Sequence, residues 1–92
     1  DDNYNARRLS NIGTFRAYCY NYLKQNPNIS DKFTCMVRQL APTTEGLPLE
    51  IYAFSSNTNW TDYEGIQADI FDHFLSIIDV FDLRVYQRYG TD

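Results

Sequence analysis

The stretch WTDYEGIQADIFDHFLSIIDVF, Trp60–Phe81, decides the fold because it has the pattern of a long amphipathic helix. Thr61 and Glu64 have the spacing of a capping box, which would satisfy free N–H groups of the first turn. At about 100° per residue, one face is apolar: Tyr63, Ile70, Phe74, Ile77 and Phe81, flanked by Trp60, Phe71 and Ile78. The opposite face is polar and mainly acidic: Asp62, Gly65, Asp69, Asp72, Ser76 and Asp79. So wide an apolar face predicts burial against a sheet or a partner.

A first helix is predicted over Ser10–Gln25, upstream of this stretch. Ser10 or Asn11 can cap it, and Asn26-Pro27-Asn28 ends it. Its apolar residues form one stripe: Ile12, Phe15, Tyr18, Cys19, Tyr22 and Leu23. Tyr20 lies off that stripe, so we expect it to point away from the core.

Two alternating segments, Phe33–Ala41 and Leu47–Phe54, predict a β-hairpin closed by the turn residues Pro42–Gly46. Both faces of the second strand carry apolar residues. We expect Leu47, Leu49, Ile51 and Ala53 to pack on the helices. The other face, with Tyr52 and Phe54, would then be covered by something outside this chain.

A short strand, Leu83–Arg88, is predicted to follow the long helix, which gives the order α-β-β-α-β. The class is α+β. The order matches a ferredoxin-like sandwich that lacks its first strand, with two helices on one face of a mainly antiparallel sheet. We predict a single domain over residues 1–92, with polar tails at 1–9 and 89–92. The open sheet edges would readily accept another strand.

The composition restricts the class of function. A net charge of −4 argues against a nucleic-acid surface, because binding to phosphates needs clustered Lys and Arg. No run approaches the roughly 20 apolar residues of a membrane span. The chain opens with Asp1 and has no starting Met, so we expect a soluble fragment of a longer protein.

The residues that carry reactive groups do not form a recognisable site. Cys19 and Cys35 lack metal-site spacing, and we interpret both as small core residues of a protein in a reducing compartment. Asp69, Asp72 and His73 form the only His–carboxylate cluster, which we interpret as a solvated ion pair of Asp69 with His73. We therefore predict no enzymatic activity, no metal and no cofactor.

Gln67 projects from the middle of the apolar face, where its amide needs hydrogen-bond partners. Two interpretations stay open. It is a core residue bonded to backbone, or it contacts another domain or subunit.

Several runs together are similar to one family: RRLSNIGTFRAY (Arg7–Tyr18), VRQLAP (Val37–Pro42), EGLPLEIYAF (Glu45–Phe54), WTDYEGIQADIFDHF (Trp60–Phe74) and LRVYQ (Leu83–Gln87). They resemble the C-terminal cytoplasmic region of small-conductance (MscS-type) mechanosensitive channels, specifically the miniconductance branch. The resemblance covers nearly the whole chain. It implies a parent with pore helices upstream, on the cytoplasmic side of the bacterial inner membrane, where membrane contact comes only through those absent segments.

The resemblance also implies assembly into a homo-oligomeric ring, most simply a heptamer. That ring would form a vestibule for ions that pass when membrane tension opens the pore in hypo-osmotic shock. The isolated fragment would be a monomer or dimer. The candidate interface residues are Tyr20, Tyr52, Phe54, Gln67, Asp69 and Asp72. The alternative is a free-standing ferredoxin-like regulatory domain that binds a small molecule, which would require a concave polar site.

Overall fold

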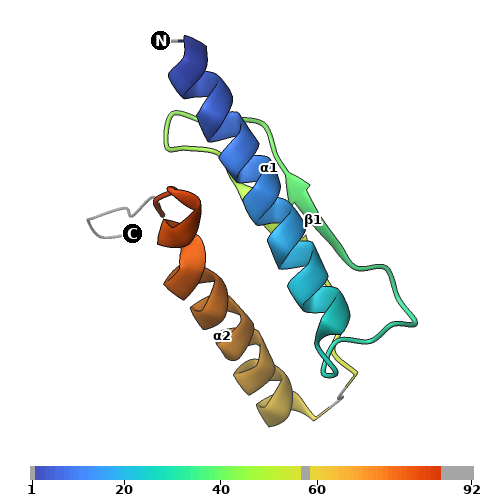
Figure 1. The fold of residues 1–92 in the computed structure, drawn as a ribbon. Coiled ribbons are helices and arrows are strands. Elements are labelled where there is room, and N and C mark those ends of the chain that lie inside the picture. Colours follow the sequence, from blue (N-terminus) through green and yellow to red (C-terminus); the bar gives the residue numbers. More distant parts are fainter. Residues whose placement is uncertain (1, 57–58, 86–92) are drawn as a thin grey trace.

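The computed structural model describes residues 2–56 and 59–85, with side chains from residue 10 onward. It contains α1 (Asp2–Gln25), β1 (Met36–Gln39), β2 (Leu49–Tyr52), α2 (Trp60–Ile77) and the 3₁₀ helix η1 (Ile78–Phe81). The two helices lie side by side and run in opposite directions, and α1 lies over the hairpin (Figure 1). The fold is α+β, as predicted.

The first helix begins at Asp2, eight residues before the expected start at Ser10. The predicted polar lead-in is therefore helical from Asp2 onward. Neither Gly nor Pro occurs over residues 2–9, and Ala6, Arg7 and Leu9 are good helix formers. The predicted end is confirmed at Gln25, where the Asn26 side chain accepts a hydrogen bond from the Asn28 N–H (2.9 Å).

The predicted hairpin is formed, and its register pairs Val37 with Ile51 and Gln39 with Leu49. The turn is also confirmed: Thr43 and Gly46 face each other across it, and Gly46 has a φ of 134°, which favours glycine. The strands are shorter than expected because another segment takes the place opposite Phe54. The Ser30 N–H donates to the Phe54 carbonyl (2.7 Å), so the first strand begins only at Met36.

The long helix begins at Trp60, as predicted, but its cap differs. The side chain of Asn59 accepts hydrogen bonds from the N–H groups of Thr61 (3.0 Å) and Asp62 (3.2 Å). Asn59 is therefore the N-cap, and Thr61 already lies inside the first turn, so the predicted capping box is wrong. The helix ends at Ile77 and continues as η1, which closes with Asp82 in the left-handed region (φ 62°).

The segment after η1 was predicted to be the strand Leu83–Arg88. Leu83 to Val85 are not in a strand, although Leu83 packs against the core. Residues 86–88 and the predicted tail at 89–92 lie outside the described residues.

The core lies between the two helices and the inner face of the hairpin. Its buried members are Phe15, Cys19, Leu23, Ile70 and Phe74. Aromatic rings pack against Phe15 of α1 from two elements: Phe74 of α2 meets it edge-to-face with centroids 6.4 Å apart, and Phe81 of η1 meets it at 5.2 Å. The helical stripes predicted from the sequence therefore supply the buried residues.

Candidate functional site

The outer face of the hairpin carries a cluster of exposed aromatic residues. Phe33, Tyr52 and Phe54 expose 59%, 46% and 41% of their surfaces. Their rings touch in series, with Phe54 5.0 Å from Phe33 and 5.3 Å from Tyr52 between centroids. Because successive strand residues face opposite sides, this cluster lies across the hairpin from Ile51, which packs on the core. The predicted exposure of Tyr52 and Phe54 is confirmed, and the structure adds Phe33.

A charged pair lies beside these rings. Arg38 and Glu50 are register partners on the two strands, and their side chains form a salt bridge through two guanidinium nitrogens. Both are about half exposed, so the pair contributes little stability, typically below about 1 kcal/mol. The pair places charged groups beside an apolar cluster. An apolar centre with a polar rim is the usual composition of a protein interface.

Tyr20 also points outward, as predicted, with 40% of its surface exposed on α1. Among the described residues it makes no ring contact with Tyr52 or Phe54. Tyr20 is therefore not part of the hairpin cluster and is a separate exposed aromatic residue.

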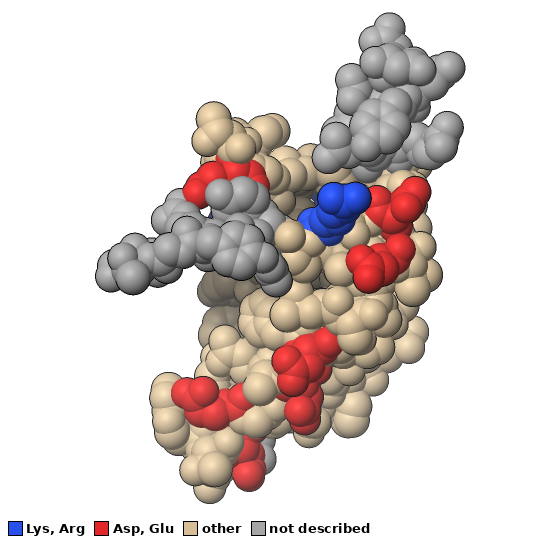
Figure 2. Space-filling view, turned by 90° about the vertical axis from the view of Figure 1, so that its left-hand side faces the viewer, with Lys and Arg blue, Asp and Glu red and all other residues tan. Residues whose placement is uncertain are grey.

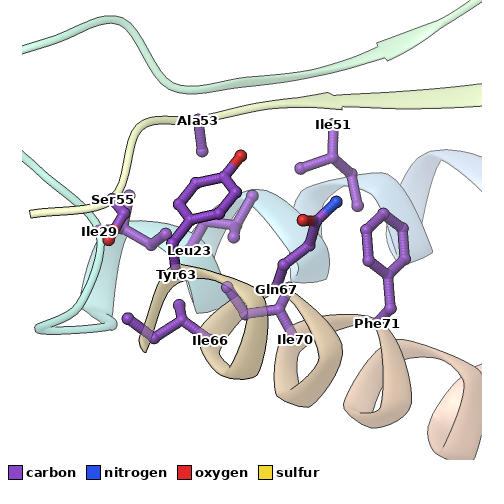
Figure 3. A pocket seen from close by; sticks show the side chains of 10 residues that line it. All are labelled: Leu23, Ile29, Ile51, Ala53, Ser55, Tyr63, Ile66, Gln67, Ile70 and Phe71. Atoms are coloured by element: carbon purple, nitrogen blue, oxygen red, sulfur yellow. The ribbon is translucent and has the colours of Figure 1, made fainter. Parts of the chain in front are cut away.

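Gln67 lines a pocket of about 120 Å³ between α2 and the hairpin (Figure 3). Its side chain extends from α2 toward β2, near Ile51 and Phe71. Gln67 is exposed and makes no hydrogen bond to any described residue, so its interpretation as a core amide bonded to backbone is wrong. The reason is its position: it lies about 60° around the helix from the buried Ile70, on the flank of α2 that the sheet does not cover.

Asp69 and Asp72 are both exposed on α2. Acidic side chains spread along this side of the molecule, and described basic residues are scarce on it (Figure 2). The predicted ion pair of Asp69 with His73 is not formed; the one ion pair among the described side chains joins Arg38 and Glu50. The acids are therefore a solvated surface.

His73 instead turns toward α1 and joins a group of stacked rings. It lies on Tyr22 with centroids 4.2 Å apart and an interplanar angle of 15°, and it forms a 2.7 Å hydrogen bond through Nε2 with the Tyr18 hydroxyl. Sequence reasoning missed this group. The signal was available, because Tyr18 and Tyr22 are four residues apart on the first helical stripe and His73 precedes the buried Phe74.

Both cysteines are free thiols in or beside the core, as predicted. Burial raises the pKa of the Cys19 thiol from its ordinary 9.0 to about 11. Burial also raises the pKa of Cys35, and the nearby positive charge of Lys24 partly opposes that shift. A nucleophilic cysteine needs a lowered pKa, so these thiols have the opposite of an activated environment.

Over residues 2–56 and 59–85, no group of three or more His, Cys, Asp and Glu is arranged to hold a metal ion. None of the described helices is both long enough and apolar enough to cross a membrane. No protein-family model matches the chain, and no solved structure matches it.

Proposed function

We propose that this chain is a non-catalytic cytoplasmic vestibule and assembly domain of a mechanosensitive ion channel of the MscS type, miniconductance branch. The observation that carries the proposal is the exposed aromatic cluster on the hairpin, Phe33, Tyr52 and Phe54. Three rings that touch in series, one at the end of β2 and the others just outside the two strands, are an unusual feature for a surface that stays in water. Aromatic residues are enriched where subunits meet.

The hairpin is suited to present such a surface. Its inner face is fixed to the core through Val37 and Ile51, so the outer rings keep a constant position relative to the helices. In the proposed ring, each hairpin would be covered by a neighbouring subunit, and the acidic surface with Asp69 and Asp72 would face the ion path. Negative charges along such a path raise the local concentration of cations.

The sequence resemblance supplies the channel part of the proposal. Its runs include the hairpin, EGLPLEIYAF (Glu45–Phe54), and most of α2. Of the surface that the proposal places between subunits, Tyr52 and Phe54 thus lie inside the resembling segments, whereas Phe33 lies outside them.

A regulatory domain that binds a small molecule is the second candidate, and the pocket beside Gln67 favours it. That pocket has a volume of about 120 Å³, whereas ligand sites usually enclose about 300–1,000 Å³. It would hold only a very small molecule, which makes this the weaker proposal.

The proposal is tested by pressure-clamp recording on membrane patches from cells that lack their own tension-gated channels and express the complete gene product. We expect currents that rise with tension, and improved survival of hypo-osmotic shock. The double variant Tyr52→Lys, Phe54→Lys should reduce the number of active channels several-fold. A control with equal added charge at exposed positions, Gln25→Lys with Thr44→Lys, should keep them. Patches whose current does not change with tension would contradict the channel proposal. Saturable micromolar binding of a metabolite, with a gain in Tm, would also contradict it.

A further inference from the structure

The pocket between α2 and the inner face of the hairpin is open because a small residue follows β2. The inward positions of this segment are Leu49, Ile51 and Ala53, of which the first two pack against the core. Ala53 carries only a methyl group, so a space of about 120 Å³ remains between it and Tyr63 (Figure 3). An apolar cavity of about 150 Å³ takes up benzene. The pocket therefore has room for about one six-membered ring.

The walls of the pocket are held by contacts of their own. Leu23 of α1, at the inner end, has 0% of its surface exposed. Ile29 and Ser55 line the pocket as partners in a β-bridge, which ties the loop after α1 to the segment after β2. On α2, the ring of Tyr63 stacks on Trp60 with centroids 5.8 Å apart and an interplanar angle of 20°. A ligand would thus enter a space whose walls are already in place, which lowers the cost of binding.

The lining determines the chemical class of the ligand. None of the ten described residues that line the pocket carries a charge, so a charged ligand would lose water without gaining an ion partner. Gln67 lies about one helical turn from both Tyr63 and Phe71, and its side chain extends toward β2 (Figure 3). Its amide makes no hydrogen bond to a described residue. Because an amide both donates and accepts, it can bond a hydroxyl in either sense.

We propose that this pocket binds a small neutral molecule with one ring and one hydroxyl group. The ring would lie against Leu23, Ile51 and Ile70, and the hydroxyl would bond to the Gln67 amide. A ligand with so few atoms binds weakly, so we expect a Kd of about 1 mM. The inference goes beyond the channel proposal and holds whether or not the chain belongs to a channel. Binding this weak is also distinct from the micromolar binding that would contradict the channel.

The test is an NMR titration of the chain, labelled at its isoleucine methyl groups, with benzyl alcohol. Saturable shifts with a Kd of about 1 mM are expected for Ile51, Ile66 and Ile70, which line the pocket, and none for Ile12, which does not. Benzoate and benzylammonium have the same ring and opposite charges. Both should bind at least about tenfold more weakly because of the cost of burying a charge. Using both signs separates this cost from the effect of the net charge of −4.

Three variants locate the site. Ala53→Leu fills the pocket and should weaken binding at least about tenfold, whereas Ala68→Leu adds the same side chain at an exposed position outside the lining and should keep the affinity within about twofold. Gln67→Leu should weaken binding of benzyl alcohol about two- to tenfold, as for one ordinary hydrogen bond. Toluene, which lacks the hydroxyl, should not lose affinity in this variant.

Three results would overturn the proposal. The first is the absence of saturable shifts up to about 10 mM benzyl alcohol, ten times the expected Kd. The second is equal binding of benzyl alcohol and its two charged counterparts. The third is unchanged affinity in an Ala53→Leu variant that melts as the wild type does. The first two use the unchanged chain, so they decide the matter even where a variant fails to fold.

Discussion

Two phenylalanines three residues apart on α2 provide a sharp test of the packing. Phe74 is 4% exposed and meets Phe15 and Tyr22 edge-to-face, with centroids 6.4 and 5.4 Å apart. Phe71 is 43% exposed and lines the pocket. Replacement of either by Leu keeps an apolar side chain of good helix propensity. The two substitutions therefore differ in what the ring contacts, and hardly in intrinsic helix preference.

Phe74→Leu removes two edge-to-face contacts, each contributing about 0.5–1.5 kcal/mol beyond area burial, so the free energy of unfolding should fall by about 2 kcal/mol. A loss of that size lowers Tm by about 10 °C in a domain of this length. Phe71→Leu should change the free energy by less than about 0.5 kcal/mol.

The assay is urea unfolding followed by far-UV circular dichroism, with equal m-values as the check that both variants keep the same two-state transition. Equal losses in the two variants, or a larger loss for Phe71→Leu, would refute the assignment of the core to the Phe74 side of α2.

Three further predictions concern the cap, the thiols and the acidic face. Asn59→Ala should lower the free energy of unfolding by about 1 kcal/mol because it removes the N-cap, whereas Thr61→Ala should change it by less than about 0.5 kcal/mol. A larger loss for Thr61→Ala than for Asn59→Ala in urea unfolding would show that Thr61 is the cap. The raised pKa of Cys19 means that the folded state holds its proton more tightly than the unfolded state. Its contribution to stability is therefore full below about pH 9 and is lost as the pH rises toward 11, and a Cys19→Ala variant should lack this loss in pH-dependent thermal melts. Asp69→Lys with Asp72→Lys should leave unfolding within about 0.5 kcal/mol of the wild type, since both are exposed. In the complete gene product it should shift permeation toward anions, and unchanged conductance, selectivity and assembly would reduce these acids to a solubilising surface.

The sequence was a good guide wherever periodicity determines what is buried. The helical stripe with Phe15, Cys19 and Leu23, and Ile70 and Phe74 on α2, became the core because helix spacing brings these residues to one face. The alternation in the second strand also placed Tyr52 on the outside. Periodicity shows which side chains share one face of a helix or strand, and the face that packs on the core supplies the buried residues.

Element ends and side-chain partners were harder to predict. The start of α1 depends on residues 2–9, in which no Gly or Pro interrupts the helix, and the N-cap of α2 depends on a choice between Asn59 and Thr61, two residues apart. Both candidates are good caps, so local preference alone does not separate them.

The positions of Gln67 and His73 depended on tertiary packing. A helical wheel places Gln67 near the centre of the apolar face, yet the two-stranded sheet of the described chain is too narrow to cover that flank of α2. A helical wheel also places His73 near the acids, whereas in the structure its ring stacks on Tyr22 of α1. Neither the width of the sheet nor the ring partner can be read from one helix.

The proposal that the hairpin cluster is covered between subunits is most directly tested by the labelling rate at position 54. Phe54→Cys is made in a Cys35→Ala background, in which the remaining thiol, Cys19, is buried with a raised pKa. A maleimide is then applied to the isolated chain and to the complete gene product in its native membrane. The account predicts rapid labelling of the isolated chain and labelling at least about tenfold slower in the membrane, as expected for a thiol removed from solvent. Equal rates in the two samples would contradict it.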